Sequence, residues 1–171
     1  MLMAFFKKKY TPNEIAEGLY SLCASEETIN SSMQFYTQGK NPLDSNFHIK
    51  LRWHTYALHL FICDYICFQK YGDSPLKNKI LDSFYKLVVD NLSGQPNDKL
   101  ITKAMFSEIN IYGDAVRGKS LDDLLLLIGK LFADAVDEPK ESLFLMVAGS
   151  GIFTKFSVSI DKWLDEIKVI I

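Results

Sequence analysis

The sequence contains few cysteines and no marked excess of charge, and both shortages exclude classes of protein. Its 171 residues include three cysteines, Cys23, Cys63 and Cys67, an odd number that does not make a disulfide framework. Reduced, buried thiols of a cytoplasmic protein explain them best. Nineteen lysines and arginines stand against 21 aspartates and glutamates. We therefore expect no surface for binding nucleic acid.

The N-terminus lacks the order of a secretory signal. Residues 1–10 read MLMAFFKKKY, with the apolar residues first and the lysines after them, whereas a signal has its positive charges before a longer apolar core. We expect an apolar and basic N-terminal tag over 1–10 that docks on the protein or stays mobile. One short apolar segment is a poor membrane anchor, so the expected location is the cytoplasm, without membrane contact.

Glycine and proline are both missing from residues 48–71, so nothing interrupts a single helix there. At helical spacing the apolar side chains cover most of its circumference, which predicts a buried central helix. The charged residues inside the stretch argue against a membrane span. One polar strip remains, formed by Arg52, Thr55, His59 and Lys70.

Capping signals and helical spacing predict further helices on both sides of this stretch. Thr11, Pro12 and Glu14 match the N-cap, the first helical position and the reach-back residue of a capping box. We expect an all-α, single-domain bundle of six to seven helices over 11–171, with a loop at 39–46 and a subdomain break near 93–97. The helices are expected at 12–24, 26–38, 48–71, 75–92, 98–117, 121–136 and from 152 onward, after a segment opened by Pro139.

Two polar residues of the central helix fall outside its polar strip. His54 and Asp64 lie on apolar faces, and a buried carboxylate needs a hydrogen-bond donor. The first interpretation of Asp64 is a structural polar group, and the second is a site carboxylate with a perturbed pKa. The two side chains stand about 15 Å apart along the helix axis, so they cannot touch each other. With His59 they form the candidate ligand pocket of this sequence.

No metal or cofactor site is predicted. His59, Cys63 and Cys67 lie on successive turns of one helix, but three ligands on one ridge span about 12 Å and cannot share an ion. We interpret them as two packing cysteines and a histidine at the polar edge. The glycines in Ala148–Gly151 lack the full pattern of a phosphate-binding turn. They indicate a bend between two helices or a close helix crossing.

The last helix suggests an interaction face. Because no catalytic constellation is visible, we favour a non-enzymatic cytoplasmic protein that binds or regulates a protein partner, or self-associates as a homodimer. The alternative is a small enzyme or ligand-binding bundle with a polar pocket around Asp64 and His54. The expected interaction face consists of Phe153, Phe156, Ile160, Trp163, Leu164 and Ile167.

Overall fold

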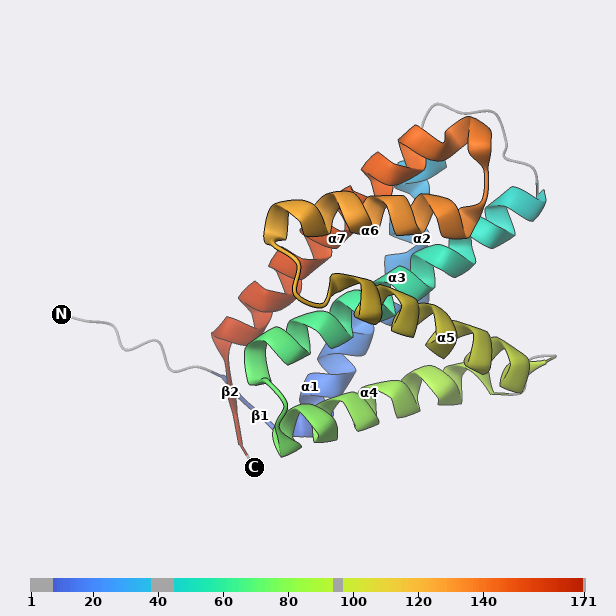
Figure 1. Ribbon diagram of the computed structural model, residues 1–171. Coiled ribbons are helices and arrows are strands. Elements are labelled where there is room, and N and C mark those ends of the chain that lie inside the picture. Colours follow the sequence, from blue (N-terminus) through green and yellow to red (C-terminus); the bar gives the residue numbers. More distant parts are fainter. Residues whose placement is uncertain (1–7, 38–44, 94–96, 171) are drawn as a thin grey trace.

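The protein is an all-α bundle, as the sequence predicts. The structure is a computed structural model that describes residues 8–37, 45–93 and 97–170. Figure 1 shows the helices stacked around a long central one, with both described chain ends meeting at one corner. The α-helices of the described residues are α1 (Pro12–Leu19), α2 (Glu26–Thr37), α3 (Ser45–Tyr71), α4 (Pro75–Leu92), α5 (Asp98–Val116), α6 (Leu121–Val136) and α7 (Ser142–Glu166).

Helix α3 is the predicted central helix, and it contacts α2, α4, α5, α6 and α7 (Figure 1). It begins at Ser45, so the last two residues of the predicted 39–46 loop are helical, while 39–44 lie outside the described residues. The predicted polar strip is wrong in its centre. Thr55 and His59 are fully buried, because α3 has neighbours on the side where a helical wheel places solvent.

Helix starts follow the predicted capping chemistry. Thr11 Oγ1 accepts a hydrogen bond from the Glu14 amide at 3.3 Å, and the Glu14 carboxylate accepts one from the Thr11 amide at 2.7 Å. This confirms the capping box. The helix then widens into a π-helical turn, Tyr20–Ala24, before α2 begins. Of the predicted break at 93–97, residues 94–96 lie outside the described part, so the subdomain division stays a prediction.

Helices α6 and α7 form a tightly packed hairpin, and α7 is one unbroken helix from Ser142 to Glu166. A bend near Gly149 and a helix start at Ile152 were therefore wrong predictions. The alternative, a close crossing, is confirmed: a Cβ on Gly149 would lie 2.7 Å from the Cβ of Phe132. Ser150 Oγ adds a hydrogen bond of 2.7 Å to the carbonyl oxygen of Leu125 on α6.

A small parallel sheet joins the two ends of the described chain, and the sequence analysis did not predict it. Strand β1 (Lys8–Tyr10) pairs with β2 (Ile167–Val169), with Tyr10 opposite Val169. Ile167 therefore begins a strand and does not extend the last helix. The part of the N-terminal tag that the structure describes is paired backbone. Residues 1–7 lie outside the described part.

Glycine substitutions test the close crossing of α6 and α7. A Cβ on Gly129 would clash with the backbone carbonyl of Met146, whereas one on Gly113 in α5 would meet nothing within 4 Å. We expect Gly129→Ala to lower the free energy of unfolding by about 1–3 kcal/mol through overpacking. Gly113→Ala should raise it by about 0.5–1 kcal/mol, because alanine has the higher helix propensity. Urea denaturation measures both, and equal effects would contradict the crossing.

Candidate functional site: a pocket beside the central helix

The three residues of the predicted ligand pocket do not come together. Each makes its own contact with a different neighbour of α3. His54 Nδ1 lies 2.9 and 3.0 Å from the two carboxylate oxygens of Glu108 on α5. Asp64 accepts a hydrogen bond of 3.2 Å from the hydroxyl of Tyr85 on α4. The contacts among the described residues therefore direct His54, Asp64 and His59 to separate neighbours of α3.

His59 is a buried structural residue and not a histidine at a polar edge. Its Nδ1 lies 2.9 Å from the carbonyl oxygen of Cys23, and its Nε2 lies 3.1 Å from Ser32 Oγ. A carbonyl oxygen only accepts, so Nδ1 carries the proton and Nε2 accepts from the serine hydroxyl. Burial lowers the pKa of His59 to about 4, against the opposing effect of the Cys23 carbonyl. The imidazole is therefore neutral at physiological pH.

The cysteines beside His59 are packing residues. Cys63 and Cys67 are fully buried with free thiols, and burial raises the pKa of Cys63 well above its usual range. A protonated thiol is neither a good nucleophile nor a metal ligand. Within residues 8–37, 45–93 and 97–170, no three histidine, cysteine or acidic side chains are grouped closely enough to hold a metal ion.

Asp64 has the kind of partner that the sequence requires, a tyrosine hydroxyl. Burial raises the pKa of its carboxyl group, and the hydrogen bond from Tyr85 partly opposes that effect. Asp64 also lines a depression between α3 and the end of α5, together with Tyr65 and Val116. The contact with Tyr85 joins α3 to α4, which fits the interpretation of Asp64 as a structural polar group.

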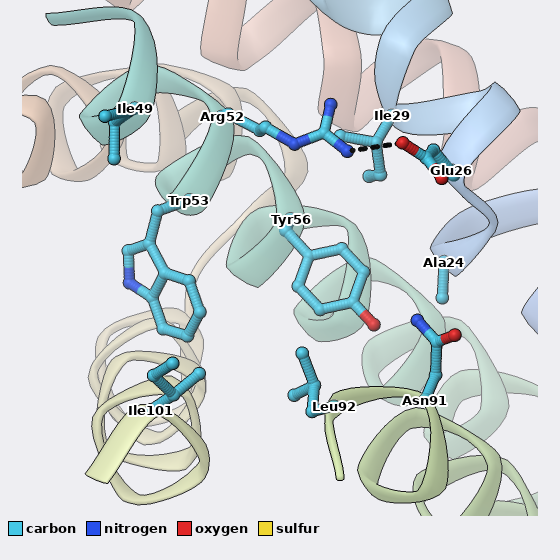
Figure 2. A pocket seen from close by; sticks show the side chains of 10 residues that line it. All are labelled: Ala24, Glu26, Ile29, Ile49, Arg52, Trp53, Tyr56, Asn91, Leu92 and Ile101. Carbon is cyan, nitrogen blue, oxygen red and sulfur yellow. Dashed lines mark ion pairs between the residues drawn. The ribbon is translucent and has the colours of Figure 1, made fainter. Parts of the chain in front are cut away.

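A different site opens where the first half of α3 faces the end of α4 and the start of α5 (Figure 2). Its volume is about 340 Å³. The side chains of Trp53 and Tyr56 extend from α3 across this space, above Ile101 and Leu92. The lining residues are Ala24, Glu26, Ile29, Ile49, Arg52, Trp53, Tyr56, Asn91, Leu92 and Ile101.

Four polar side chains, Glu26, Arg52, Tyr56 and Asn91, give this pocket its chemistry. Arg52 reaches over one edge, where it contacts Glu26 at 3.5 Å and donates a hydrogen bond to Asn30. The buried hydroxyl of Tyr56 has no hydrogen-bond partner among the described residues. Burial raises the pKa of that hydroxyl, so it is a neutral donor at physiological pH. The exposed amide of Asn91 lies beside it (Figure 2).

Sequence reasoning missed this pocket, although a signal for it is present. The i, i+3, i+4, i+7 spacing of one helix face is present at Ile49, Arg52, Trp53 and Tyr56. That pattern does not stand out in this sequence, because α3 is apolar on nearly every side.

Comparison with known proteins adds no family to this description. The chain matches no protein-family model, and no curated protein or solved structure is significantly similar to it.

The burial of His59 predicts a pH dependence of stability. Its folded pKa of about 4 lies below the ordinary value of 6.5, so below pH 6.5 the unfolded chain binds a proton that the folded protein does not. The contribution of neutral His59 to the free energy of unfolding is fully present above that pH and decreases as the solution is acidified. Between pH 7 and pH 5 we expect His59 to account for a loss of about 2 kcal/mol.

Urea denaturation at the two pH values measures this effect. His59→Gln retains a polar side chain without titrating in this range, so the variant should lose about 2 kcal/mol less than the wild type on acidification. Carboxyl groups titrate in both proteins, and their contribution cancels in the comparison. An identical pH dependence for the two proteins would contradict a buried, neutral His59.

Proposed function

We propose that this protein is a cytoplasmic helical binding protein, and that it recognises a protein partner by enclosing one of the partner's apolar side chains in the pocket beside α3. One observation carries the proposal: Trp53, Tyr56 and Arg52 line the same pocket. Tryptophan, tyrosine and arginine are the residue types that dominate the binding energy of protein interfaces. Buried in a desolvated pocket, each contributes more than it does on open surface.

The surroundings of the pocket support a protein partner over a small ligand. Sites for small molecules enclose most of their ligand and have volumes of about 300–1,000 Å³, and this pocket is at the lower end of that range. Its apolar surface also continues outward, since the Ile49 side chain is 65% exposed. An apolar anchor with further contacts around it is the arrangement that protein interfaces use.

The polar groups around the pocket suggest how a partner would be oriented. Arg52 and Glu26 form a charged rim, and such rims exclude water from the apolar centre of an interface. The hydroxyl of Tyr56 is buried, so its ring is the part of Tyr56 that faces a partner. A partner segment with an aliphatic or aromatic side chain for the pocket and polar groups beside it for Arg52 and Glu26 fits this arrangement.

Catalysis is less well supported. The polar side chains that sequence reasoning placed in a possible active site each contact a different helix, and burial keeps His59 neutral. A reaction needs such groups within hydrogen-bond reach of one substrate atom.

Selection of a random peptide library on the immobilised protein tests the proposal. We expect the selected peptides to share an apolar anchor and to lose at least tenfold in affinity for Ile49→Asp, measured by calorimetry. The new carboxylate would place a charged, hydrated group beside the bound apolar side chain, whereas Ile49 is exposed enough that the fold tolerates the change. The matched control is Ile111→Asp, an exposed isoleucine of α5 outside the pocket.

The indole signals of the protein provide a second measurement. The chain has two tryptophans, of which Trp53 lines the pocket and Trp163 packs against Gly18. In ¹⁵N-labelled protein, a bound peptide should shift the indole resonance of Trp53 and leave that of Trp163 in place. Peptides that bind both isoleucine variants equally, or that shift only Trp163, would overturn the proposal.

A further inference from the structure

The depression lined by Asp64 is a second pocket, separate from the one beside the first half of α3. It lies between the second half of α3 and the end of α5, and the two pockets share no lining residue. Its volume is about 480 Å³, which is within the range of about 300–1,000 Å³ that is typical of sites for small molecules. We call it the Asp64 pocket.

The Asp64 carboxylate has one oxygen to offer a ligand. Tyr85 donates a hydrogen bond to Oδ2, and no other described residue forms a hydrogen bond or an ion pair with Asp64. Lys77 attracts the carboxylate, but its ammonium pairs with Asp73 at 3.1 Å. Burial outweighs both effects and raises the pKa of Asp64, so the fold compensates this charge only in part. A bound cation would complete the compensation.

The walls of the Asp64 pocket are apolar. Tyr65 and Phe68 of α3 face Ile109 and Val116 of α5 across it, and the Phe68 side chain is 49% exposed. The Phe68 ring already attracts one cation of the protein, since Lys77 Nζ lies 5.4 Å from its centroid. A carboxylate beside aromatic and aliphatic surface suits an amine that is attached to a hydrocarbon body.

The mouth of the pocket carries the opposite charge. Arg117 and Lys119 follow the end of α5 at Val116, and both line the pocket with exposed side chains. Arg117 pairs with Asp114 at 3.5 Å, whereas Lys119 forms no ion pair with a described side chain. The charge of the lining therefore changes from negative at the half-buried Asp64 to positive at the exposed mouth.

We propose that the Asp64 pocket binds a small zwitterion with a primary ammonium group at one end, a carboxylate at the other and a hydrocarbon segment between them. The ammonium donates a hydrogen bond to Asp64 Oδ1. The hydrocarbon segment lies against Tyr65 and Phe68, and the carboxylate meets Lys119 at the mouth. This inference does not depend on the pocket beside α3.

The separation of the two charges distinguishes this ligand from an α-amino acid. In an α-amino acid the ammonium and the carboxylate are attached to the same carbon. Binding its ammonium to Asp64 would bring the carboxylate of the ligand close to that of the protein, and two like charges in a partly buried site repel each other. A ligand with charges at opposite ends keeps its carboxylate at the mouth.

Calorimetry at neutral pH with simple compounds tests the proposal. We expect the best of 4-aminobutanoate, 6-aminohexanoate and 8-aminooctanoate to bind at least tenfold more tightly than the alkanoate of the same length, which has no ammonium group. It should bind at least threefold more tightly than the matching alkylamine, because an exposed ion pair with Lys119 contributes modestly. No binding by the whole series, or equal binding of the amino acid and the alkylamine, overturns the proposal.

Variants assign the two ends of the ligand. Asp64→Asn keeps an acceptor for Tyr85 but removes the charge, so both the amino acid and the alkylamine should lose at least tenfold in affinity. Lys119→Gln should reduce the affinity for the amino acid to that for the alkylamine, which should itself be unchanged. The matched control is Lys103→Gln, an exposed lysine of α5 outside the pocket, with no effect expected. Because Lys119 is exposed, its variant tests the proposal even if Asp64→Asn lowers stability.

Nuclear magnetic resonance of the ¹⁵N-labelled protein locates the bound compound. Gly113 and Gly118 line the Asp64 pocket, so their amide resonances should shift on binding. The indole resonance of Trp53, in the pocket beside α3, should not move. Affinities that neither Asp64→Asn nor Lys119→Gln changes, or shifts confined to Trp53, would place the compound elsewhere and overturn the proposal.

Discussion

The burial of α3 on nearly every side is the constraint from which the rest of the fold follows. Its neighbours come from both halves of the chain, and each supplies an apolar face to it. The polar side chains on α3 then need partners inside the protein. His59 finds its partners in the Cys23 carbonyl and Ser32, which fixes the π-helical turn and α2 against α3. Asp64 and His54 do the same for α4 and α5 through Tyr85 and Glu108. Polar groups that resemble an active site in the sequence thus hold the neighbouring helices in register.

Local chemistry made the helices predictable, because it depends on residues close in the chain. Thr11 caps its helix as predicted, Ser74 and Ser120 are the N-caps of α4 and α6, and α4 and α6 have the predicted limits. The errors lie where distant residues decide the outcome. Ser32 is 27 positions from His59, so a helical wheel cannot reveal that this imidazole is covered. Gly149 permits either a bend or a crossing, and only the position of Phe132 on another helix decides between them. The pairing of β1 with β2 spans almost the whole chain.

The apolar character of α3 on nearly every side made this helix easy to predict and the candidate site on it hard to recognise. On an ordinary amphipathic helix, the set Ile49, Arg52, Trp53 and Tyr56 would stand out as an unusual face. On a helix that is apolar nearly all round, this set looks like any other core-facing side. What distinguishes it is that α4 ends and α5 begins without closing over it, which is a property of the tertiary structure. Periodicity identifies residues that avoid water, and it cannot separate those covered by the protein from those left for a partner.

The last helix shows the same ambiguity, resolved in the opposite direction. The interaction face expected from the sequence is its buried side, where Phe153, Ile160, Leu164 and Ile167 fill the core, so that expectation was wrong. Its outward side remains exposed at Leu143, Val147 and Val158. The pocket draws its lining from the π-helical turn and α2 to α5, and the outward face lies on α7, so the two surfaces have no residue in common.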